Sequence, residues 1–270
     1  MATISNIGNY DDYGRKKVDE QLKELESRLS AMYKKASRDI IRDFDSFVSQ
    51  FDRMDKIKQE QVKQGNLSQE AYDNWRRSQV MRSSAMSSEI DKLSNRLVNV
   101  DKEAMVMVNE ELPSVYVTSY NWAGFRGETY AEMAGLDYRT FDIVNKDAIR
   151  ILQQEDPDLI PWKPMPDEEK DKTWNRKHLQ NAIEQGIKSG DSMPDVAKRL
   201  MPVVNMDENA AIRTARTAIN GVENKGRKDA TERIREAGIP MIEVWKCLHD
   251  SRTRSTHIML DETHPNEDGF

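Results

Sequence analysis

A long apolar stripe near the start of the chain is the feature that most restricts the fold. From Val18 to Met54 the apolar residues recur at steps of three and four, the heptad spacing of a coiled coil, with one four-residue insertion near Ile40. No Gly or Pro occurs between residues 15 and 64, so a helix over Val18–Met54 would be about 55 Å long. Such a helix cannot bury its stripe alone. We therefore expect it to pack against later helices or against another chain.

A second helical segment is expected to follow. The sequence QGNLSQEAYDNW provides a helix end at Gly65 and a new N-cap at Ser68. Apolar residues at helical spacing then run from Ile90 to Leu112, where Pro113 is expected to end the helix. Residues 1–112 are thus predicted to form a long-helix region, a hairpin or a small bundle. It could be an ordinary helical domain or a rod that docks onto a partner.

The composition suits long, exposed helices. Charged residues make up 33% and apolar residues 37% of the 270 residues. The net charge of −6 does not indicate general affinity for nucleic acid. The first residues lack the apolar run of a signal peptide, and no run of about 18 apolar residues predicts a membrane span, so no membrane partner is expected. A single cysteine cannot form an internal disulfide, which fits synthesis in a reducing cytoplasm.

The second half of the chain divides into a connector and a domain. Residues 113–166 lose helical periodicity and contain several prolines, which is typical of an irregular connector. Helical spacing then returns, with Ser192 and Asp207 as expected N-caps and Gly238 at the C′ position of a long helix. The following MIEVWKCLH alternates as a strand does. The expected fold class is mainly α with a small C-terminal β element (α+β), in which long N-terminal helices precede a compact helical/β domain at 167–270.

The stretch WKCLHDSRTRSTH, from Trp245 to His257, concentrates reactive side chains. As a metal site it offers only the weak candidates Cys247, His249 and His257, whereas structural zinc usually takes four ligands at short paired spacings. As a thiol enzyme it lacks a glycine-rich turn or helix N-terminus after Cys247 to supply oxyanion donors. We expect no metal, no other cofactor and no catalytic residue.

Arginine is the more informative residue type in this stretch. In an extended segment Arg252 and Arg254 would point to the same side, beside Asp250, and a guanidinium needs carboxylate, phosphate or carbonyl partners. The preceding helix carries Arg213 and Arg216 in one stripe. If the strand folds back onto this helix, these arginines and Asp250 form one polar cluster that holds the C-terminal domain together. Otherwise they form two separate solvated faces.

The same helix supplies the candidates for DNA binding. Between Asp207 and His257 there are ten Lys or Arg and eight Asp or Glu, a weak positive surplus compared with that of DNA-binding domains. The candidate contacts to phosphate are Arg213, Arg216, Lys225, Arg227, Lys228 and Arg233.

Three separated sequence blocks resemble the head-morphogenesis domain of the Mu F-like minor head proteins of tailed phages. They are WNRKHLQNAIEQGIKSGDSMPDVAKRL, AAIRTARTAINGVENKGRKDA and AGIPMIEVWKCLHDSRTRSTHIMLDE, and the resemblance extends over about residues 167 to 262. Carried over by position, the structural motif of the family comprises Arg213, Arg216, Trp245, Asp250, Arg252, Arg254 and His257.

The resemblance implies a structural minor capsid protein, not an enzyme, inside the virion or procapsid at the portal vertex. It would act in procapsid assembly and in genome packaging or ejection. The implied partner is the portal protein, docked by the long N-terminal helices, with scaffold, major capsid protein and viral double-stranded DNA as further candidates. Two alternatives stay open, a non-specific DNA-binding protein of the virion interior and a zinc-dependent hydrolase.

Two departures from the family pattern bear on these implications. Relatives often carry Cys-x-x-Cys where this chain has Arg254 to His257, so a metal site in those relatives does not transfer to it. Glu262 stands where a glycine often follows the Leu-Asp pair.

The predicted polar cluster leads to a test at Asp250. Loss of one partner from a buried charged network costs about 3–5 kcal/mol. We therefore expect Asp250→Ala to lower the melting temperature clearly in thermal unfolding followed by circular dichroism. An unchanged melting curve together with normal particle assembly would contradict the cluster.

Overall fold

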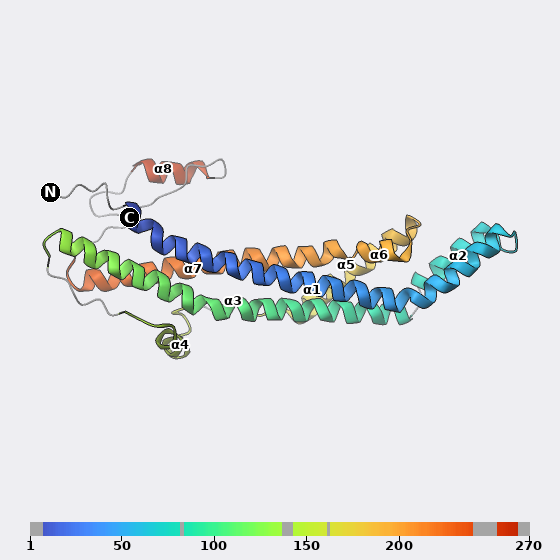
Figure 1. Ribbon diagram of the computed structural model, residues 1–270, viewed down its shortest axis with the longest axis horizontal. Helices are drawn as coiled ribbons and strands as arrows, with labels where there is room; N and C mark the ends of the chain where they lie inside the picture. The colour runs from blue at the N-terminus through green and yellow to red at the C-terminus, as the bar shows by residue number, and fades with distance from the viewer. Residues whose placement is uncertain (1–7, 82–83, 137–142, 161–162, 240–252, 264–270) are drawn as a thin grey trace. The chain divides into compact units, whose positions relative to one another are not determined.

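All regular secondary structure in the described part of the chain is helical. The computed structural model describes residues 8–81, 84–136, 143–160, 163–239 and 253–263. The helices labelled in Figure 1 are α1 (Gly8–Lys63), α2 (Gln69–Met81), α3 (Ser84–Met133), α4 (Lys146–Glu155), α5 (Glu168–Lys188), α6 (Met193–Lys198), α7 (Met201–Glu236) and α8 (Ser255–Thr263). Within these ranges, no helix combines the length and the apolar content needed to cross a membrane.

The chain forms two compact units, each assembled from separated stretches. Unit 1 comprises Met1–Val18, Ser114–Glu155 and Val222–Phe270. Unit 2 comprises Asp19–Pro113 and Asp156–Gly221. Helices α1, α3 and α7 each contribute residues to both units. The predicted division into a long-helix region (1–112), a connector (113–166) and a C-terminal domain (167–270) concerns the roles of these regions. It stays a prediction.

Unit 2 is a bundle of long helices that run antiparallel to their neighbours. Partner numbers fall along α3 as they rise along α1, from Arg28–Glu111 to Asp43–Arg96. They fall likewise along α7, since Glu26 pairs with Arg216 and Tyr33 lies near Asp207. Its ion pairs include Arg28–Glu111 (3.5 Å) and Asp43–Arg96 (2.7 Å) between α1 and α3, Asp91–Arg176 (3.3 Å) between α3 and α5, and Glu26–Arg216 (2.5 Å) between α1 and α7. These partly exposed ion pairs join neighbouring helices of the bundle.

The apolar stripe of α1 is buried within the chain, as one of the two expected arrangements requires. Its most buried members do not follow a strict heptad, because the steps from Leu25 through Leu29 and Tyr33 to Ala36 are four, four and three, a repeat of 11 residues. An 11-residue repeat corresponds to about 3.67 residues per turn, close to a straight helix. The stripe ends earlier than predicted, since Met54 is 47% exposed. The buried apolar residues that α1 contributes to unit 2 are Leu25, Leu29, Tyr33, Ala36, Ile40, Phe44 and Val48.

The expectation that Pro113 ends the second long helix is wrong, because α3 continues through it to Met133. Proline removes one backbone hydrogen bond and costs about 3 kcal/mol inside a helix. Apolar side chains are buried on both sides of it, with Leu112 at 1%, Val115 at 0% and Tyr116 at 3% exposure. Burial of this stretch offsets the local cost, so the first part of the predicted connector is helical.

The predicted small C-terminal β element is also wrong. The described residues contain no strand, and the described segment 253–263, which follows the predicted strand, forms α8. The amides of His257 and Ile258 donate to the carbonyl of Arg254 (2.9 and 3.2 Å), so Arg254 precedes the first turn of this helix. The stretch MIEVWKCLH itself lies within residues 240–252, outside the described ranges. Alternation over so short a stretch does not provide the neighbouring strand that a sheet requires.

Several helix ends are confirmed. The Ser68 hydroxyl accepts from the Ala71 amide (3.1 Å), and Ser192 caps α6. At the end of α7, Gly238 has φ +90° and its amide donates to Arg235, while the Ile239 amide donates to Ile234 (3.3 Å). This is the Schellman pattern, in which glycine takes the left-handed conformation. Asp207, in contrast, does not cap a helix, because α7 already begins at Met201.

A close helix contact in unit 1 leads to a prediction for Gly226. A Cβ there would lie 2.8 Å from the carbonyl oxygen of Tyr116 and 3.2 Å from the Cβ of Ser119, and a backbone atom cannot rotate away. Gly226→Ala should therefore lower the free energy of unfolding by about 1–2 kcal/mol, despite alanine's higher helix propensity.

The matched control for this change is Gly221→Ala on the same helix. A Cβ at Gly221 would meet no atom within 4 Å, so the substitution should raise stability by up to about 1 kcal/mol. Urea unfolding of the three proteins measures both effects. Equal changes in the two variants would contradict the packing argument.

Candidate functional site

The predicted motif residues are only partly within the described chain. Arg213 and Arg216 lie on the exposed side of α7, Arg254 is exposed just before α8, and His257 is half-buried in that helix. Trp245, Cys247, His249, Asp250 and Arg252 lie outside the described residues. The described partner of Arg216 is Glu26, whose two carboxylate oxygens accept from its guanidinium at 2.5 and 3.2 Å. The predicted cluster around Asp250 stays a prediction.

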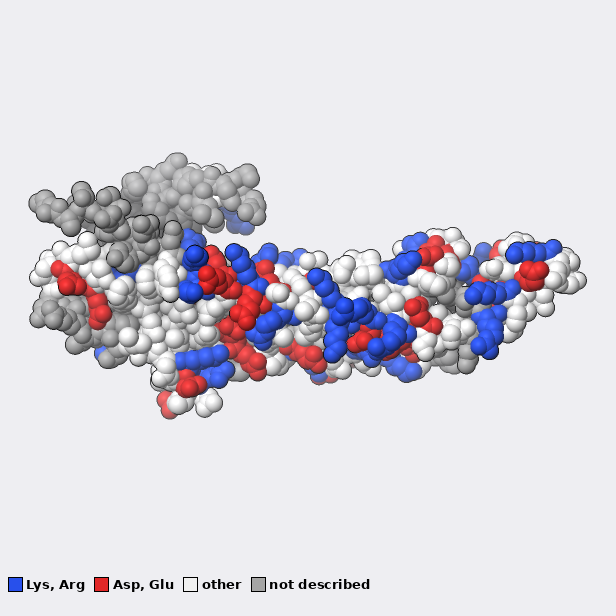
Figure 2. All heavy atoms as spheres, in the orientation of Figure 1, with Lys and Arg blue, Asp and Glu red and all other residues white. Residues whose placement is uncertain are grey.

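Five of the six cations predicted to bind DNA already pair with a carboxylate. On the face drawn in Figure 2, Lys and Arg side chains alternate with Asp and Glu and do not gather into one basic surface. Each nearby carboxylate reduces the positive potential that would attract phosphate. The pairs are Arg216–Glu26, Lys225–Asp229 (2.8 Å), Arg227–Glu223, Lys228–Glu232 (3.7 Å) and Arg233–Glu236 (3.5 Å).

Arg213, the sixth cation, lies at the edge of a large cavity in unit 2. The cavity has a volume of about 680 Å³ and is bordered by α1, α3, α5, α7 and the segment before α5. This volume lies within the roughly 300–1,000 Å³ range of ligand sites. Its walls are mainly apolar, formed by Met105, Pro164, Met165, Pro166, Trp174 and Met206.

Three carboxyl groups from three helices line this apolar cavity. Asp101 comes from α3, Asp171 from α5 and Asp207 from α7. Burial, and then the charges of Asp101 and Asp171, raise the pKa of Asp207 to about 8. Burial also raises the pKa of Asp101 to about 6, against the opposing effect of its hydrogen bond with Tyr33. Asp101 and Asp207 are thus poorly solvated, and the three carboxyl groups are close enough to repel one another.

The buried residue Tyr33 holds one of these carboxyl groups in place. Its hydroxyl donates to Asp101 Oδ1 at 2.6 Å, and its side chain is 1% exposed. Burial and the neighbouring negative charge of Asp101 raise the pKa of Tyr33 far above its ordinary value. The phenol therefore keeps its proton and donates this hydrogen bond.

An unpaired amide completes the cavity. Asn175 of α5 is only 1% exposed, and neither its side-chain oxygen nor its nitrogen has a hydrogen-bond partner. The Oδ2 atom of Asp207 is likewise buried without a partner. A buried polar group left unpaired costs about 1–3 kcal/mol, so such groups are uncommon without a functional reason. The sequence indicates neither role, because Asp207 has a residue type and position that predict a helix cap and Asn175 carries no local signal.

The cavity does not have the geometry of a metal centre. Among the residues that the structure describes, no three His, Cys, Asp or Glu side chains come close enough together to hold a metal ion. Two of the three weak metal candidates, Cys247 and His249, lie outside the described ranges. The arrangement can instead accept a ligand with hydrogen-bond donors and an apolar body.

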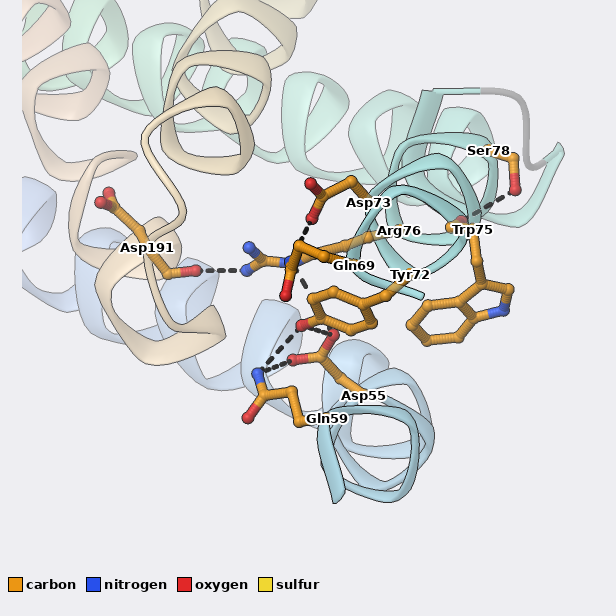
Figure 3. Close-up of polar contacts among 9 residues, drawn as sticks. All are labelled: Asp55, Gln59, Gln69, Tyr72, Asp73, Trp75, Arg76, Ser78 and Asp191. Atoms are coloured by element: carbon orange, nitrogen blue, oxygen red, sulfur yellow. Dashed lines mark hydrogen bonds and ion pairs between the residues drawn. The ribbon is translucent and has the colours of Figure 1, made fainter. Parts of the chain in front are cut away.

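A second buried polar cluster joins α1 and α2 to the loop between α5 and α6 (Figure 3). The Asp55 carboxylate accepts from the Tyr72 hydroxyl (2.8 Å) and from the Gln59 amide (3.0 Å), and it lies 3.7 Å from Arg76 Nε. Arg76 also donates to the backbone oxygen of Asp191 (2.5 Å). Each side chain of this cluster has at least one polar partner within it, although Arg76 Nε itself makes no hydrogen bond, and the contacts join three segments of the chain, so we assign the cluster a structural role.

Comparison with known proteins supports the predicted family. Residues 177–268 match the family described as Phage Mu protein F like protein. The chain is also 26% identical over 183 residues to the minor head protein GP7 of Bacillus phage SPP1. This alignment covers 67% of the chain and 57% of that relative, so the chain spans little more than half of the relative's length. No solved structure matches the chain significantly.

The predicted resemblance to Mu F-like phage minor head proteins is thereby confirmed. The matched region begins within α5 and includes α6, α7 and α8. Of the cavity residues, Asp207 and Arg213 lie inside it, whereas Tyr33 and Asp101 come from the long N-terminal helices.

The cavity predicts a pH dependence of stability. The pKa of Asp207 in the folded protein is about 8, above its ordinary 3.8. A group with a raised folded pKa stabilises the fold fully at low pH and loses that contribution as the pH rises through the folded value. The free energy of unfolding should therefore fall between about pH 4 and pH 8. Asp207→Asn, which cannot ionise, should be more stable than the parent above pH 8, by roughly a few kcal/mol.

Urea unfolding of the parent and of Asp207→Asn across this pH range measures the effect. The difference between the two proteins isolates Asp207 from other titrating groups. Identical pH profiles would show that this carboxyl group is well solvated.

The cluster in Figure 3 predicts a large effect at Arg76. Side-chain exposure is 12% for Arg76 and 9% for Asp55. Arg76→Ala would leave the buried carboxylate without its cation and should lower stability by about 3 kcal/mol. Arg77→Ala, an exposed neighbour on α2, should change it by less than about 0.5 kcal/mol. Thermal unfolding compares the two, and equal losses would rule out the cluster as the cause.

Proposed function

We propose that this chain is a structural component of a phage head that assembles at the portal vertex. The observation that carries the proposal is the match of residues 177–268 to the Mu F-like family, together with the likeness to a protein named as a minor head protein. The match supports a structural rather than an enzymatic role. It is also the basis for placing the chain inside the procapsid or virion, where it would contribute to assembly and to genome packaging or ejection.

The fold suggests how such a protein would engage its partners. The apolar stripe of α1 is occupied within unit 2, so docking onto the portal protein would use the outer surfaces of the long helices. These surfaces carry scattered apolar residues, including Met54 (47%), Ile57 (47%) and Val106 (42% exposed). Scaffold and major capsid protein would be further contacts in the same compartment.

Mass spectrometry of procapsids and virions tests this role. We expect the chain in purified procapsids at far lower copy number than the major capsid protein. Procapsids assembled without the portal protein should lack it. Presence in portal-less procapsids would contradict the portal position while leaving the head role intact. Absence from both procapsids and virions would end the whole proposal.

A further inference from the structure

We propose that the cavity between α1, α3, α5 and α7 is a docking site for an arginine side chain presented by a segment of a partner protein. The inference rests on the cavity itself and does not depend on the role in the phage head. Three features of the cavity select this occupant: its carboxyl groups, its unpaired amide and its apolar walls.

The carboxyl groups call for a cation. Asp101, Asp171 and Asp207 approach from three helices, and their charges oppose one another. Among the described residues, none of the three has a salt bridge to Lys or Arg in the cavity. A guanidinium placed between them would offset the repulsion and could donate to the unpaired Oδ2 of Asp207. Nucleic-acid phosphate and acidic ligands are disfavoured for the same reason.

The unpaired amide distinguishes a peptide from a simple cation. Asn175 Oδ1 requires a donor, which a guanidinium supplies, but Asn175 Nδ2 requires an acceptor. A backbone carbonyl of the segment that carries the arginine would provide that acceptor. A metal ion or a free amine would leave the nitrogen unpaired.

The apolar walls suit the stem of an arginine side chain. Three methionines and Trp174 form adaptable surface along which methylene groups can be buried while the charged end reaches the carboxylates. A hydrated divalent cation would gain nothing from these walls. Arginine is preferred to lysine because its planar fork can serve several acceptors at once.

The mouth of the cavity indicates what flanks the arginine. A smaller hollow of about 300 Å³ adjoins it and shares Lys163, Ala210, Arg213 and Thr214 with the main cavity. Two of these shared residues are cations, so the hollow favours an acidic residue next to the arginine in the partner. The two hollows together place the three carboxyl groups in the larger hollow and Lys163 and Arg213 where the hollows adjoin.

Binding of a cation should be linked to proton release. The charged and titratable groups that line the cavity with Asp207 are Tyr33, Asp101, Lys163, Asp171 and Arg213, and the charge of Glu208 acts on Tyr33. Because the pKa of Asp207 is about 8, the ligand must displace a proton at lower pH. Affinity should therefore rise by up to roughly tenfold per pH unit below pH 8.

The test uses the full chain labelled with carbon-13 in its methionine methyl groups. Met105, Met165 and Met206 report on the cavity, and Met54 serves as an internal reference. The probe is the peptide acetyl-Ala-Arg-Asp-Ala-amide. Its control carries citrulline, an uncharged analogue of nearly the same shape, in place of arginine. We expect saturable shifts of the three cavity methyls with the arginine peptide, and binding at least tenfold weaker with citrulline.

Variants separate the contributions to binding. Asp207→Asn should remove the preference for arginine over citrulline, whereas Asp158→Asn, an exposed acid elsewhere in unit 2, should leave it unchanged. Arg213→Glu at the mouth should weaken the Arg-Asp peptide but not an Arg-Ala version. If Asp207→Asn does not fold, the comparison of the arginine and citrulline peptides on the parent protein still tests whether the cavity selects a cation.

Three outcomes would overturn the proposal. Equal shifts with both peptides would indicate an apolar groove without charge selection. No cavity shift at millimolar peptide would exclude the docking site. Shifts of the same methyls on raising the concentration of the protein alone would identify a second copy of the chain as the occupant.

Discussion

The burial of one side of α1 is the constraint from which the rest of unit 2 follows. A helix of 56 residues exposes a continuous apolar stripe unless other helices cover it. Parts of α3 and α7 run antiparallel to it, and Leu25, Leu29, Ile40 and Phe44 become fully buried. Burial of apolar surface stabilises the fold by roughly 25 cal/mol for each Å², so each such side chain contributes about 1.5–3 kcal/mol to the free energy of unfolding. This gain orders the bundle and determines which other side chains are taken out of water.

The cavity lies where the buried stripe of α1 includes a residue with a polar group. Tyr33 occupies a core position, and its hydroxyl brings the Asp101 carboxylate into the interior (2.6 Å). Asp207 and Asn175 then face the same space without partners of their own. An apolar core at this level would be more stable, because buried unpaired polar groups cost free energy. Such a local loss of stability is typical of a place where a ligand supplies the missing interactions.

The charged residues of α7 outside the cavity are mostly paired, unlike the carboxyl groups that line it. Most described cations of α7 pair with a carboxylate one turn away or on a neighbouring helix, for example Lys225 with Asp229. These exposed pairs contribute little to stability. They do lower the local positive potential, which explains why a helix rich in Lys and Arg does not present a basic face. The DNA-binding alternative therefore gains no support from the described surface.

Much of the local structure was determined by the sequence alone. The spacing of apolar residues predicted the buried sides of α1 and of α3 from Ile90 to Leu112, and the identity of Gly238 predicted the end of α7. The three sequence blocks were enough to indicate the family. These signals are readable because they depend on residues a few positions apart, on the same turn or the next one.

Only the tertiary structure decided the features that depend on distant residues. Pro113 lies inside a helix because buried neighbours offset its local cost. The alternating stretch did not establish a β element, because the described residues contain no strand. Aspartate is a preferred N-cap residue, but Asp207 lines a cavity together with Tyr33, Asp101 and Asn175. No local pattern reports whether a polar side chain finds a partner after packing, since that depends on which helices meet and at what register.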